Sequence, residues 1–221
     1  MSGVTAPENH AVVHVVEDDE SVRNALARLF RGAGFETRTY RSAAEFLVAE
    51  RADTPGCFVL DVGLPGMSGM ELQAATARHE NALPIVFLTG RGDIETSVRA
   101  MKAGAVDFLT KPVKRDAMLG AVRAALASDT ERRGRRQEAR VLRARFDTLT
   151  SREREVLAGV VRGKLNKQIA EELGTSVRTI KAHRSQVMEK MGMRSVAELV
   201  RAADRLTALE TVREAAVDRA A

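Results

Sequence analysis

The chain has 221 residues, 44% hydrophobic and 29% charged, so it is long enough for two small globular domains, and no run approaches the roughly 18 apolar residues of a membrane helix. A single cysteine, Cys57, excludes an internal disulfide, and residues 1–10 are polar without a signal-peptide pattern, so we expect a disordered N-terminus and a cytoplasmic protein with no membrane partner. Residues 128–221 carry 21 Lys and Arg against 14 Asp and Glu, a net charge of +7, whereas residues 1–127 carry 14 against 16, a net charge of −2, which favours a polyanion as partner of the second half only.

Residues 11–127 alternate between apolar runs and amphipathic stretches. Continuous apolar runs, typical of strands buried on both faces, occur at 12–16, 57–60, 84–88 and 106–109, with a shorter strand near 36–40. The helices between them are expected to begin at Ser21 and Ser42 and to cover about 68–77, 94–103 and 115–127. This alternation predicts a doubly wound α/β domain with a five-stranded parallel sheet and helices on both faces.

Polar side chains follow four of these strands at the points where the strands end. Glu17 and Asp18 follow the first strand, Asp61 the third, Thr89 the fourth and Lys111 the fifth. Because ligands bind at the carboxyl ends of open parallel sheets, we expect these side chains to meet in one site. Taken alone, Asp61 would more often be a helix cap or a solvated loop residue, and Lys111 a solvated surface residue. Their convergence is what indicates function.

The expected cluster has a definite chemistry. Three carboxylates in one cleft repel one another and raise each other's pKa unless a cation lies among them. Mg²⁺ prefers oxygen ligands and often binds one or two carboxylates, so it fits this position together with the ammonium group of Lys111. The metal and Lys111 would stabilise a phosphoryl group on Asp61, and the hydroxyl of Thr89 would hydrogen-bond one phosphoryl oxygen.

The first half resembles the receiver domains of two-component response regulators, which have the CheY-like fold. The resemblance covers residues 11–127 and depends on an ordered set of motifs: Glu17-Asp18, Asp61 before Leu-Pro-Gly-Met-Ser-Gly, Thr89, and Phe108 three residues before Lys111-Pro112. It implies that Asp61 accepts a phosphoryl group from a sensor histidine kinase, assisted by Lys111 and Thr89. It also implies four Mg²⁺ ligands: the side chains of Asp18 and Asp61, Glu17 through a water, and the carbonyl of Gly63.

The same resemblance implies a switch. Thr89 and Phe108 would be the switch pair, although Phe108 taken alone is more typical of a permanently buried core aromatic. The peptide bond before Pro112 is expected to be cis. Phosphorylation would reorganise the surface formed by helix 94–103, the fifth strand and the last helix, and so produce a homodimer.

Residues 128–146 are rich in arginine and show almost no apolar period before Val141. With Gly134 in the middle, this composition predicts an exposed, partly helical linker. Its two Arg-Arg pairs, at 132–133 and 135–136, fit either contacts with DNA phosphates or a solvated face, and the solvated face is the more ordinary outcome.

Four helices are predicted after residue 147, each with a recognisable start. Thr150 and Glu153 form a capping box, Asn166 is expected to cap the second helix, and Ser176 and Ser195 open the third and fourth. A tight turn containing a glycine joins the second helix to the third. This arrangement predicts an all-α four-helix domain with a helix-turn-helix, a signal that structural helical hairpins share.

The third helix has an apolar side and, opposite it, a small, polar and basic side. Such a face suits the major groove, because small residues allow close approach and polar residues donate to base edges and phosphates. The residues expected to contact DNA are Arg178, Thr179, Lys181, Ala182, His183, Ser185 and Gln186, with Asn166 and Lys167 at the start of the second helix. His183 lies at the seam, where packing or a phosphate contact is more ordinary than base reading. Arg184 is expected to bury its stem and expose its charged head.

Residues 147–208, in a predicted domain at 147–212, resemble the LuxR-type DNA-binding domain. The motifs are Thr150-Ser151-Arg152-Glu153-Arg154-Glu155-Val156-Leu157, Asn166-Lys167-Gln168-Ile169-Ala170, Thr179-Ile180-Lys181-Ala182-His183 and Met188-Glu189-Lys190-Met191. The whole chain is thus similar to the FixJ/NarL class of response regulators, its first half most of all to FixJ members, with a tail at 213–221. The resemblance implies a transcription regulator that dimerises on phosphorylation and binds an inverted repeat in double-stranded DNA, with RNA polymerase as a further candidate partner.

Two alternatives are open at this point. A phosphorylation-independent DNA-binding regulator would keep the first half only as a vestigial dimerisation module, but the complete set of strand-end residues argues against it. A phosphatase of the haloacid dehalogenase type also phosphorylates an aspartate after a parallel strand, but it needs an acid two residues later, where this chain has Gly63. We therefore expect a regulator rather than an enzyme.

Overall fold

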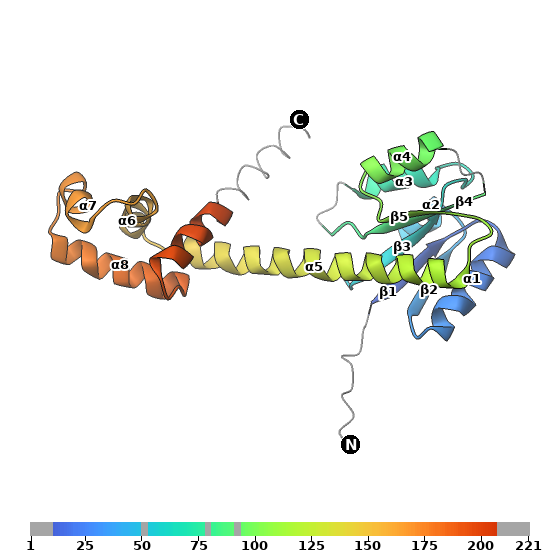
Figure 1. The fold of residues 1–221 in the computed structure, drawn as a ribbon, viewed down its shortest axis with the longest axis horizontal. Helices are drawn as coiled ribbons and strands as arrows, with labels where there is room; N and C mark the ends of the chain where they lie inside the picture. Colours follow the sequence, from blue (N-terminus) through green and yellow to red (C-terminus); the bar gives the residue numbers. More distant parts are fainter. Residues whose placement is uncertain (1–10, 50–52, 78–80, 91–93, 207–221) are drawn as a thin grey trace, which may run out of the picture. The chain divides into compact units, whose positions relative to one another are not determined.

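The computed structural model describes residues 11–49, 53–77, 81–90 and 94–206 (Figure 1). The predicted disordered segment 1–10, the predicted tail 213–221 and the end of the predicted domain 147–212 lie outside the described residues. The chain divides into two compact units between Arg133 and Gly134. None of the described helices combines the length and the apolar character of a membrane span.

The first unit is a parallel sheet with helices between successive strands. The strands are β1 (Val12–Val16), β2 (Glu36–Tyr40), β3 (Gly56–Asp61), β4 (Ile85–Thr89) and β5 (Asp107–Thr110). The helices are α1 (Glu20–Gly32), α2 (Ala43–Val48), α3 (Gly69–Thr76), α4 (Ile94–Lys102) and α5 (Arg115–Asp147). The strand order is β2-β1-β3-β4-β5, and every neighbouring pair is parallel. The predicted doubly wound α/β fold is confirmed.

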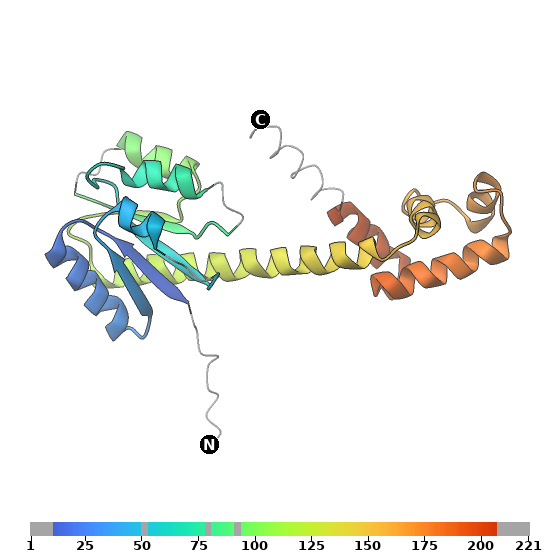
Figure 2. The same cartoon turned by 180° about the vertical axis from the view of Figure 1, so that it is seen from behind.

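Two apolar cores lie on opposite faces of this sheet (Figures 1 and 2). On one face α1 and α5 cover the sheet and bury Phe30 and Val122. On the other face α2, α3 and α4 cover it and bury Phe46 and Leu72. Cys57 belongs to the first core, and its burial raises the pKa of the thiol to about 12, so it is the core residue that its apolar strand predicts.

Helix α1 is capped by Asp19. The prediction that the helix begins at Ser21 is therefore wrong. Asp19 Oδ1 accepts hydrogen bonds from the backbone N–H of Ser21 at 2.8 Å and of Val22 at 3.0 Å. The bonds from Val22 and Ser21 lower the pKa of Asp19. Both residue types are good caps, so the local pattern alone did not decide between them. The prediction for α2 is confirmed, because Ser42 is its N-cap.

Helix α5 is longer than the predicted helix at 115–127 and includes the residues predicted as a partly helical linker at 128–146. The boundary between the two units therefore falls inside this helix, at Gly134. A glycine in a helix interior costs about 1 kcal/mol relative to alanine. Contacts from both ends of α5 offset that cost, because its first turns lie in a core of the first unit and Leu142 and Phe146 lie in the core of the second.

A polar cluster fixes α5 to the amino end of β3 within the first unit. The buried carboxylate of Asp129 accepts hydrogen bonds through Oδ2 from Gly56 N at 3.0 Å and from Arg133 Nε at 2.7 Å. Arg133 also donates to the carbonyl of Thr54 at 2.8 Å and forms an ion pair with Asp53 at 2.8 Å. Of the four arginines considered above for DNA contacts, Arg133 is thus occupied inside the first unit.

The second unit is built from helices. These are α6 (Ser151–Val161), α7 (Asn166–Glu172), α8 (Val177–Met191) and a further helix that covers 196–206 of the described residues. The capping box of Thr150 and Glu153 is present, and Ser176 caps α8. The N-cap position of α7 is Leu165, and not Asn166 as predicted. Gln168 Oε1 accepts from the N–H of Leu165 at 2.7 Å, while the side chain of Asn166 turns to α8.

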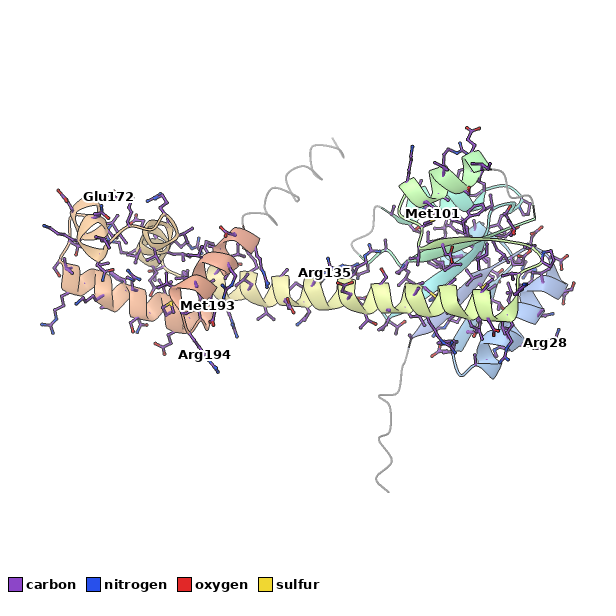
Figure 3. The ribbon with its side chains drawn as sticks, in the orientation of Figure 1. Arg28, Met101, Arg135, Glu172, Met193 and Arg194 are labelled. Carbon is purple, nitrogen blue, oxygen red and sulfur yellow. The ribbon has the colours of Figure 1, made fainter. Side chains whose placement is uncertain are left out.

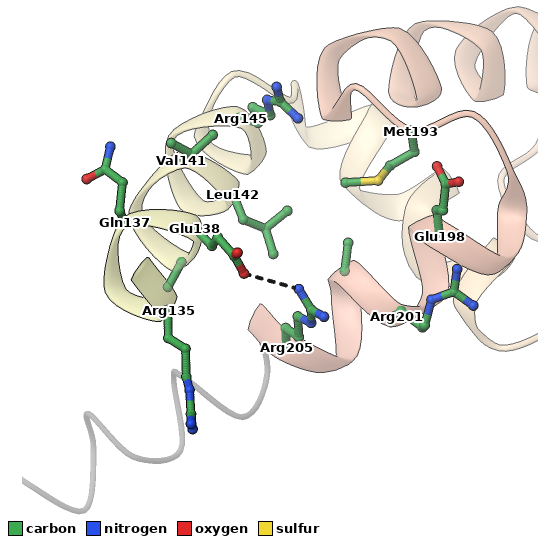
Figure 4. Close-up of a pocket in the computed structure, with 12 residues that line it drawn as sticks. Arg135, Gln137, Glu138, Val141, Leu142, Arg145, Met193, Glu198, Arg201 and Arg205 are labelled. Atoms are coloured by element: carbon green, nitrogen blue, oxygen red, sulfur yellow. Dashed lines mark ion pairs between the residues drawn. The ribbon is translucent and has the colours of Figure 1, made fainter. Parts of the chain in front are cut away.

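A pocket in the second unit lies between the last turns of α5 and helix 196–206 (Figure 4). Its lining residues are Arg135, Gln137, Glu138, Ala139, Val141, Leu142, Arg145, Met193, Glu198, Arg201, Ala202 and Arg205. Glu138 and Arg205 pair across it at 3.8 Å. The pocket is thus lined by apolar side chains and by charged groups, two of which form an ion pair with each other.

Candidate functional site

The carboxylates predicted to converge do so at the carboxyl ends of β1 and β3. Glu17, Asp18 and Asp61 each place one oxygen within 4.8 Å of the others. The two strands are neighbours in the sheet, with Val16 in register with Leu60, so the residues that follow them meet. Glu17 and Asp61 are buried and Asp18 is exposed, so the cluster reaches solvent on the side of Asp18.

Lys111, which follows β5, places its ammonium among these carboxylates. Its Nζ lies 2.9 and 2.7 Å from the two carboxylate oxygens of Glu17 and 3.2 Å from Asp61 Oδ1. The N–H of Lys111 donates to the carbonyl of Thr89 at 2.7 Å, which fixes the end of β5 to β4. The bond between Lys111 and Pro112 is cis, as predicted.

The charges of this cluster are strongly coupled. Burial raises the pKa of Glu17, and the charge of Asp61 adds to that effect against the hydrogen bond from Lys111. Burial alone would lower the pKa of Lys111, but its hydrogen bond to Glu17 and the charge of Asp61 more than offset this, so its pKa lies above its usual value. A buried acid with a raised pKa beside a second carboxylate is typical of functional sites.

Thr89 and Phe108 lie on the adjacent strands β4 and β5. Thr89 is buried at the end of β4, in register with Thr110. Phe108 is half-buried, and its ring centroid lies 6.2 Å from that of Phe87. Its partial exposure fits a residue at the edge of the core better than a permanently buried one, and the switch role of the pair stays a prediction.

Helix α4 exposes apolar side chains. Ile94 is 82% exposed, and Val98 and Met101 are also exposed (Figure 3 labels Met101). The buried residue of this helix is Ala100, which packs on the sheet. The exposed side of α4 therefore suits the dimer surface predicted for helix 94–103.

Two residues that support the site were missed from the sequence. Arg23 donates through Nη1 to the carbonyls of Glu17 at 2.8 Å and Asp18 at 2.9 Å, and so holds the acidic loop. Gly69 lies so close to β3 that a Cβ there would be 2.3 Å from the backbone oxygen of Asp61. No local pattern marks Arg23, whereas Gly69 belongs to the motif after Asp61, and the motif alone does not indicate the close approach to β3.

The donor set fits a hard divalent cation. Three carboxylates and one ammonium leave an excess of negative charge, and carboxylate oxygens are the ligands that Mg²⁺ prefers. Glu17 already gives both oxygens to Lys111, which suits a contact through water rather than direct ligation. A Cβ at Gly63 would lie 3.5 Å from Asp61 Oδ2, so the missing side chain leaves space beside that oxygen.

The predicted DNA-contacting residues of α8 share one side of the helix. Ile180, Val187 and Met191 are buried on the opposite side, as the apolar period predicts. The residues on the outer side fall into two groups by exposure: Arg178, Lys181, Ala182, Ser185 and Gln186 are exposed, and Thr179 and His183 are partly buried. The hydroxyl of Thr179 lies 2.8 Å from that of the cap Ser176.

The start of α7 lies next to this face. Lys167 is exposed, whereas Asn166 is partly buried and accepts a hydrogen bond through Oδ1 from Arg184 Nη1 at 2.5 Å. The stem of Arg184 lies among apolar residues, because Arg184 lines a small cavity with Val160 and Leu199. Residue types and periodicity predicted the buried stem but not the partner of the guanidinium group.

Comparisons with known proteins agree with both halves of this structure. Residues 13–123 match the family described as "Response regulator receiver domain", and residues 147–203 match "Bacterial regulatory proteins, luxR family". Receiver domains bind Mg²⁺ through acidic residues, and the acidic cluster above is of that kind. The fold and the site thus define a response regulator with a receiver and a LuxR-type DNA-binding domain.

Full-length relatives share this arrangement. Nodulation protein W of Bradyrhizobium diazoefficiens is 46% identical over 206 residues, 93% of this chain and 91% of that protein. Transcriptional regulatory protein FixJ of Azorhizobium caulinodans is 43% identical over 192 residues, 86% of this chain and 90% of that protein. The solved structure of response regulator StyR is 46% identical, with a TM-score of 0.79 over 89% of this chain and 99% of that chain. The chain belongs to the FixJ-like family of transcriptional response regulators.

Proposed function

We propose that this protein is a phosphorylation-activated transcription regulator of the cytoplasm. A sensor histidine kinase phosphorylates Asp61, and the phosphorylated protein dimerises and binds an inverted repeat in DNA, where RNA polymerase is a further candidate partner. The observation that carries the proposal is the ammonium group of Lys111, which lies within 3.2 Å of both Glu17 and Asp61 at the carboxyl end of the sheet.

Asp61 acts as the nucleophile toward a phosphohistidine. A carboxylate oxygen attacks the phosphorus, the phosphorus–nitrogen bond breaks, and the imidazole leaves. Lys111 holds Oδ1, while Oδ2 lies beside the space left at Gly63. Lys111 stabilises the charge that develops on the phosphoryl oxygens, because it is already in reach of the acceptor. Mg²⁺ supplies further neutralisation when it is bound by Asp18, Asp61, the carbonyl of Gly63 and, through water, Glu17.

Thr89 and Phe108 transmit the change to the α4 surface. The hydroxyl of Thr89 moves to hydrogen-bond a phosphoryl oxygen, and Phe108, which is half-buried before the reaction, turns into the space that Thr89 leaves. Both strands adjoin α4, whose exposed side presents Ile94, Val98 and Met101. Burial of these three side chains between two copies is the driving force for the dimer.

The second unit reads DNA with α8 in the major groove. Arg178 and Lys181 supply charge to phosphates and donors to base edges, and Ala182 allows close approach. Thr179, Ser185 and Gln186 supply further polar contacts, and His183 contacts a phosphate. Asn166 and Lys167 contact the phosphates that flank the groove. Two copies of α8 in a symmetric dimer require an inverted repeat.

The test is acetyl phosphate labelling of the full chain, with and without Mg²⁺, followed by intact mass and light scattering. We expect one phosphoryl group per chain in the presence of Mg²⁺, conversion to a dimer, and tighter binding of duplexes selected from a random pool. Asp61→Asn is expected to abolish all three responses, whereas Glu36→Gln, an exposed acid on β2 at the edge of the sheet opposite β5, leaves them intact. Equal dimerisation and DNA binding by Asp61→Asn would favour the vestigial receiver instead.

A further inference from the structure

Arg184 of α8 lies beside a small cavity and bonds to α7. It lines a small apolar cavity with residues of α6 (Val156 and Val160) and of helix 196–206 (Val196 and Leu199). Its guanidinium group then reaches α7, where Nη1 donates to Asn166 Oδ1 at 2.5 Å across 18 residues of sequence. A stem that is packed in this way leaves the guanidinium group little freedom, so the bond to Asn166 holds a defined geometry.

The chemistry of this bond decides how the amide of Asn166 is oriented. A guanidinium group has donors and no acceptor, so the oxygen of Asn166 must face Arg184. The NH₂ group of Asn166, which carries two N–H donors, then points away from Arg184. Without Arg184 the amide could rotate by half a turn and present its oxygen instead, which a phosphate would repel.

We infer that Arg184 is a positioning residue for DNA binding: it orients the side-chain amide of Asn166 so that the NH₂ group donates to a phosphate oxygen of the duplex. This inference deepens the proposed function and rests on it, because it assumes that α7 and α8 face DNA.

The competing role for Arg184 is a phosphate contact of its own. Arg184 is only partly buried, and an arginine beside a DNA-binding face often pairs with phosphate directly. The two roles differ in coupling. A positioning residue loses its effect when Asn166 is absent, whereas an independent phosphate contact adds to the effect of Asn166.

The experiment is a double-mutant cycle on the full chain with Asn166→Ala, Arg184→Ala and the double variant. The probe is a fluorescent duplex of fixed mixed sequence, and anisotropy gives the dissociation constant over a series of salt concentrations. Each single variant is expected to weaken binding by about 2- to 10-fold, the size of one hydrogen bond. The slope of log K against log salt is expected to stay nearly unchanged in each, because a neutral amide neutralises no phosphate, and the double variant should resemble the single ones. A slope reduced by about 1 in Arg184→Ala would instead indicate a phosphate contact of its own.

Two controls separate positioning from general damage. Met188→Ala removes another residue that lines the same cavity and is expected to leave the dissociation constant within about 2-fold of the unchanged protein. Arg184→Lys keeps the charge and a donor, so it should recover part of the affinity only when Asn166 is present. Rescue by Arg184→Lys in the Asn166→Ala background, or additive losses in the double variant, overturns the inference.

Failure of the proposed function gives a different pattern. Joint replacement of Arg178 and Lys181 by alanine is expected to weaken binding more than either single variant of the cycle. If that change has no effect, α8 does not face the duplex, and the proposed DNA face and this inference both fail. If it weakens binding while Asn166 and Arg184 act additively, only the inference fails.

Discussion

Among the described residues, each unit buries one glutamate against one lysine, and the two pairs have the same distances. Lys111 Nζ lies 2.9 and 2.7 Å from the oxygens of Glu17, and Lys190 Nζ lies 2.9 and 2.7 Å from those of Glu153. Their pKa values nevertheless move in opposite directions. Burial raises the pKa of Glu17, whereas the hydrogen bond from Lys190 and that from the backbone of Thr150 lower the pKa of Glu153.

The difference lies in the remaining neighbours of each pair. Glu17 shares its lysine with Asp61 and has Asp18 beside it, so one ammonium serves three carboxylates. Glu153 has Lys190 and the N-cap of α6, so its charge is fully compensated. An ion pair with unbalanced negative charge nearby is typical of a ligand-binding site, whereas a pair with balanced charge stabilises the fold. The two pairs should therefore respond in opposite ways to the same substitutions.

The largest expected effect is on the phosphorylation of Asp61, which depends on Lys111 of the Glu17–Lys111 pair. Lys111→Met should slow acetyl phosphate labelling of Asp61 by about 100-fold or more, because the charge that develops on the phosphoryl oxygens loses its donor. Intact mass against time measures the rate. Lys190→Met, the same change in the second pair, serves as the matched control and should leave the rate unaltered. A labelling rate for Lys111→Met within a few-fold of the unchanged protein would remove Lys111 from the mechanism.

The next effect is on the stability of the second unit. Lys190→Met should destabilise it by about 1–3 kcal/mol, because Glu153 loses a charged hydrogen-bond partner while it remains buried. Native-state hydrogen exchange of α6 and α8 measures this locally, which a chain of two units requires. Exchange in β3 and β4 should not change. Unaltered protection of α6 would show that the pair is not a brace.

The sequence was sufficient for features that depend on short-range spacing or on the order of strands. The strand-end rule brought Glu17, Asp61 and Lys111 together. The three-residue spacing of Thr150 and Glu153 located one cap, and residue type located another at Ser176. Contacts between residues far apart in sequence left no such signal. The bonds of Arg133 to Asp53, 80 residues away, and of Arg184 to Asn166, 18 residues away, depend on how separate elements of a unit pack together.

The continuity of α5 was missed for a related reason. Its middle turns have no apolar period, and Gly134 disfavours a helix, so local preference predicted a partly helical linker. The structure holds these turns with the buried carboxylate of Asp129, a residue type that a sequence pattern assigns to the surface. Tertiary contacts outweighed local propensity.

A smaller change in the free energy of unfolding, opposite in sign to that of Lys190→Met, is expected at the Glu17–Lys111 pair. Asp61→Asn should stabilise the first unit by about 1 kcal/mol in the absence of divalent cations, because it removes one of three mutually repelling carboxylates. Hydrogen exchange of β3 and β4 in a chelator measures it. The corresponding neutral change at the second pair, Glu153→Gln, should destabilise its unit. A loss of protection in Asp61→Asn would mean that the acidic cluster is not under repulsion.

The smallest expected effect is a pH dependence that belongs to the second pair. The pKa of Glu153 is lowered in the folded state, so its contribution to stability is complete above the unfolded value of about 4.5 and is lost as the pH falls through the folded value. The difference in protection of α6 between the unchanged protein and Glu153→Gln should thus be constant near neutral pH and shrink in acid, by less than about 1 kcal/mol. Other carboxylates titrate in both proteins and cancel in that difference. A difference that stays constant into strong acid would show that Glu153 is not held ionised by Lys190, and the contrast between the two pairs would then rest on the first pair alone.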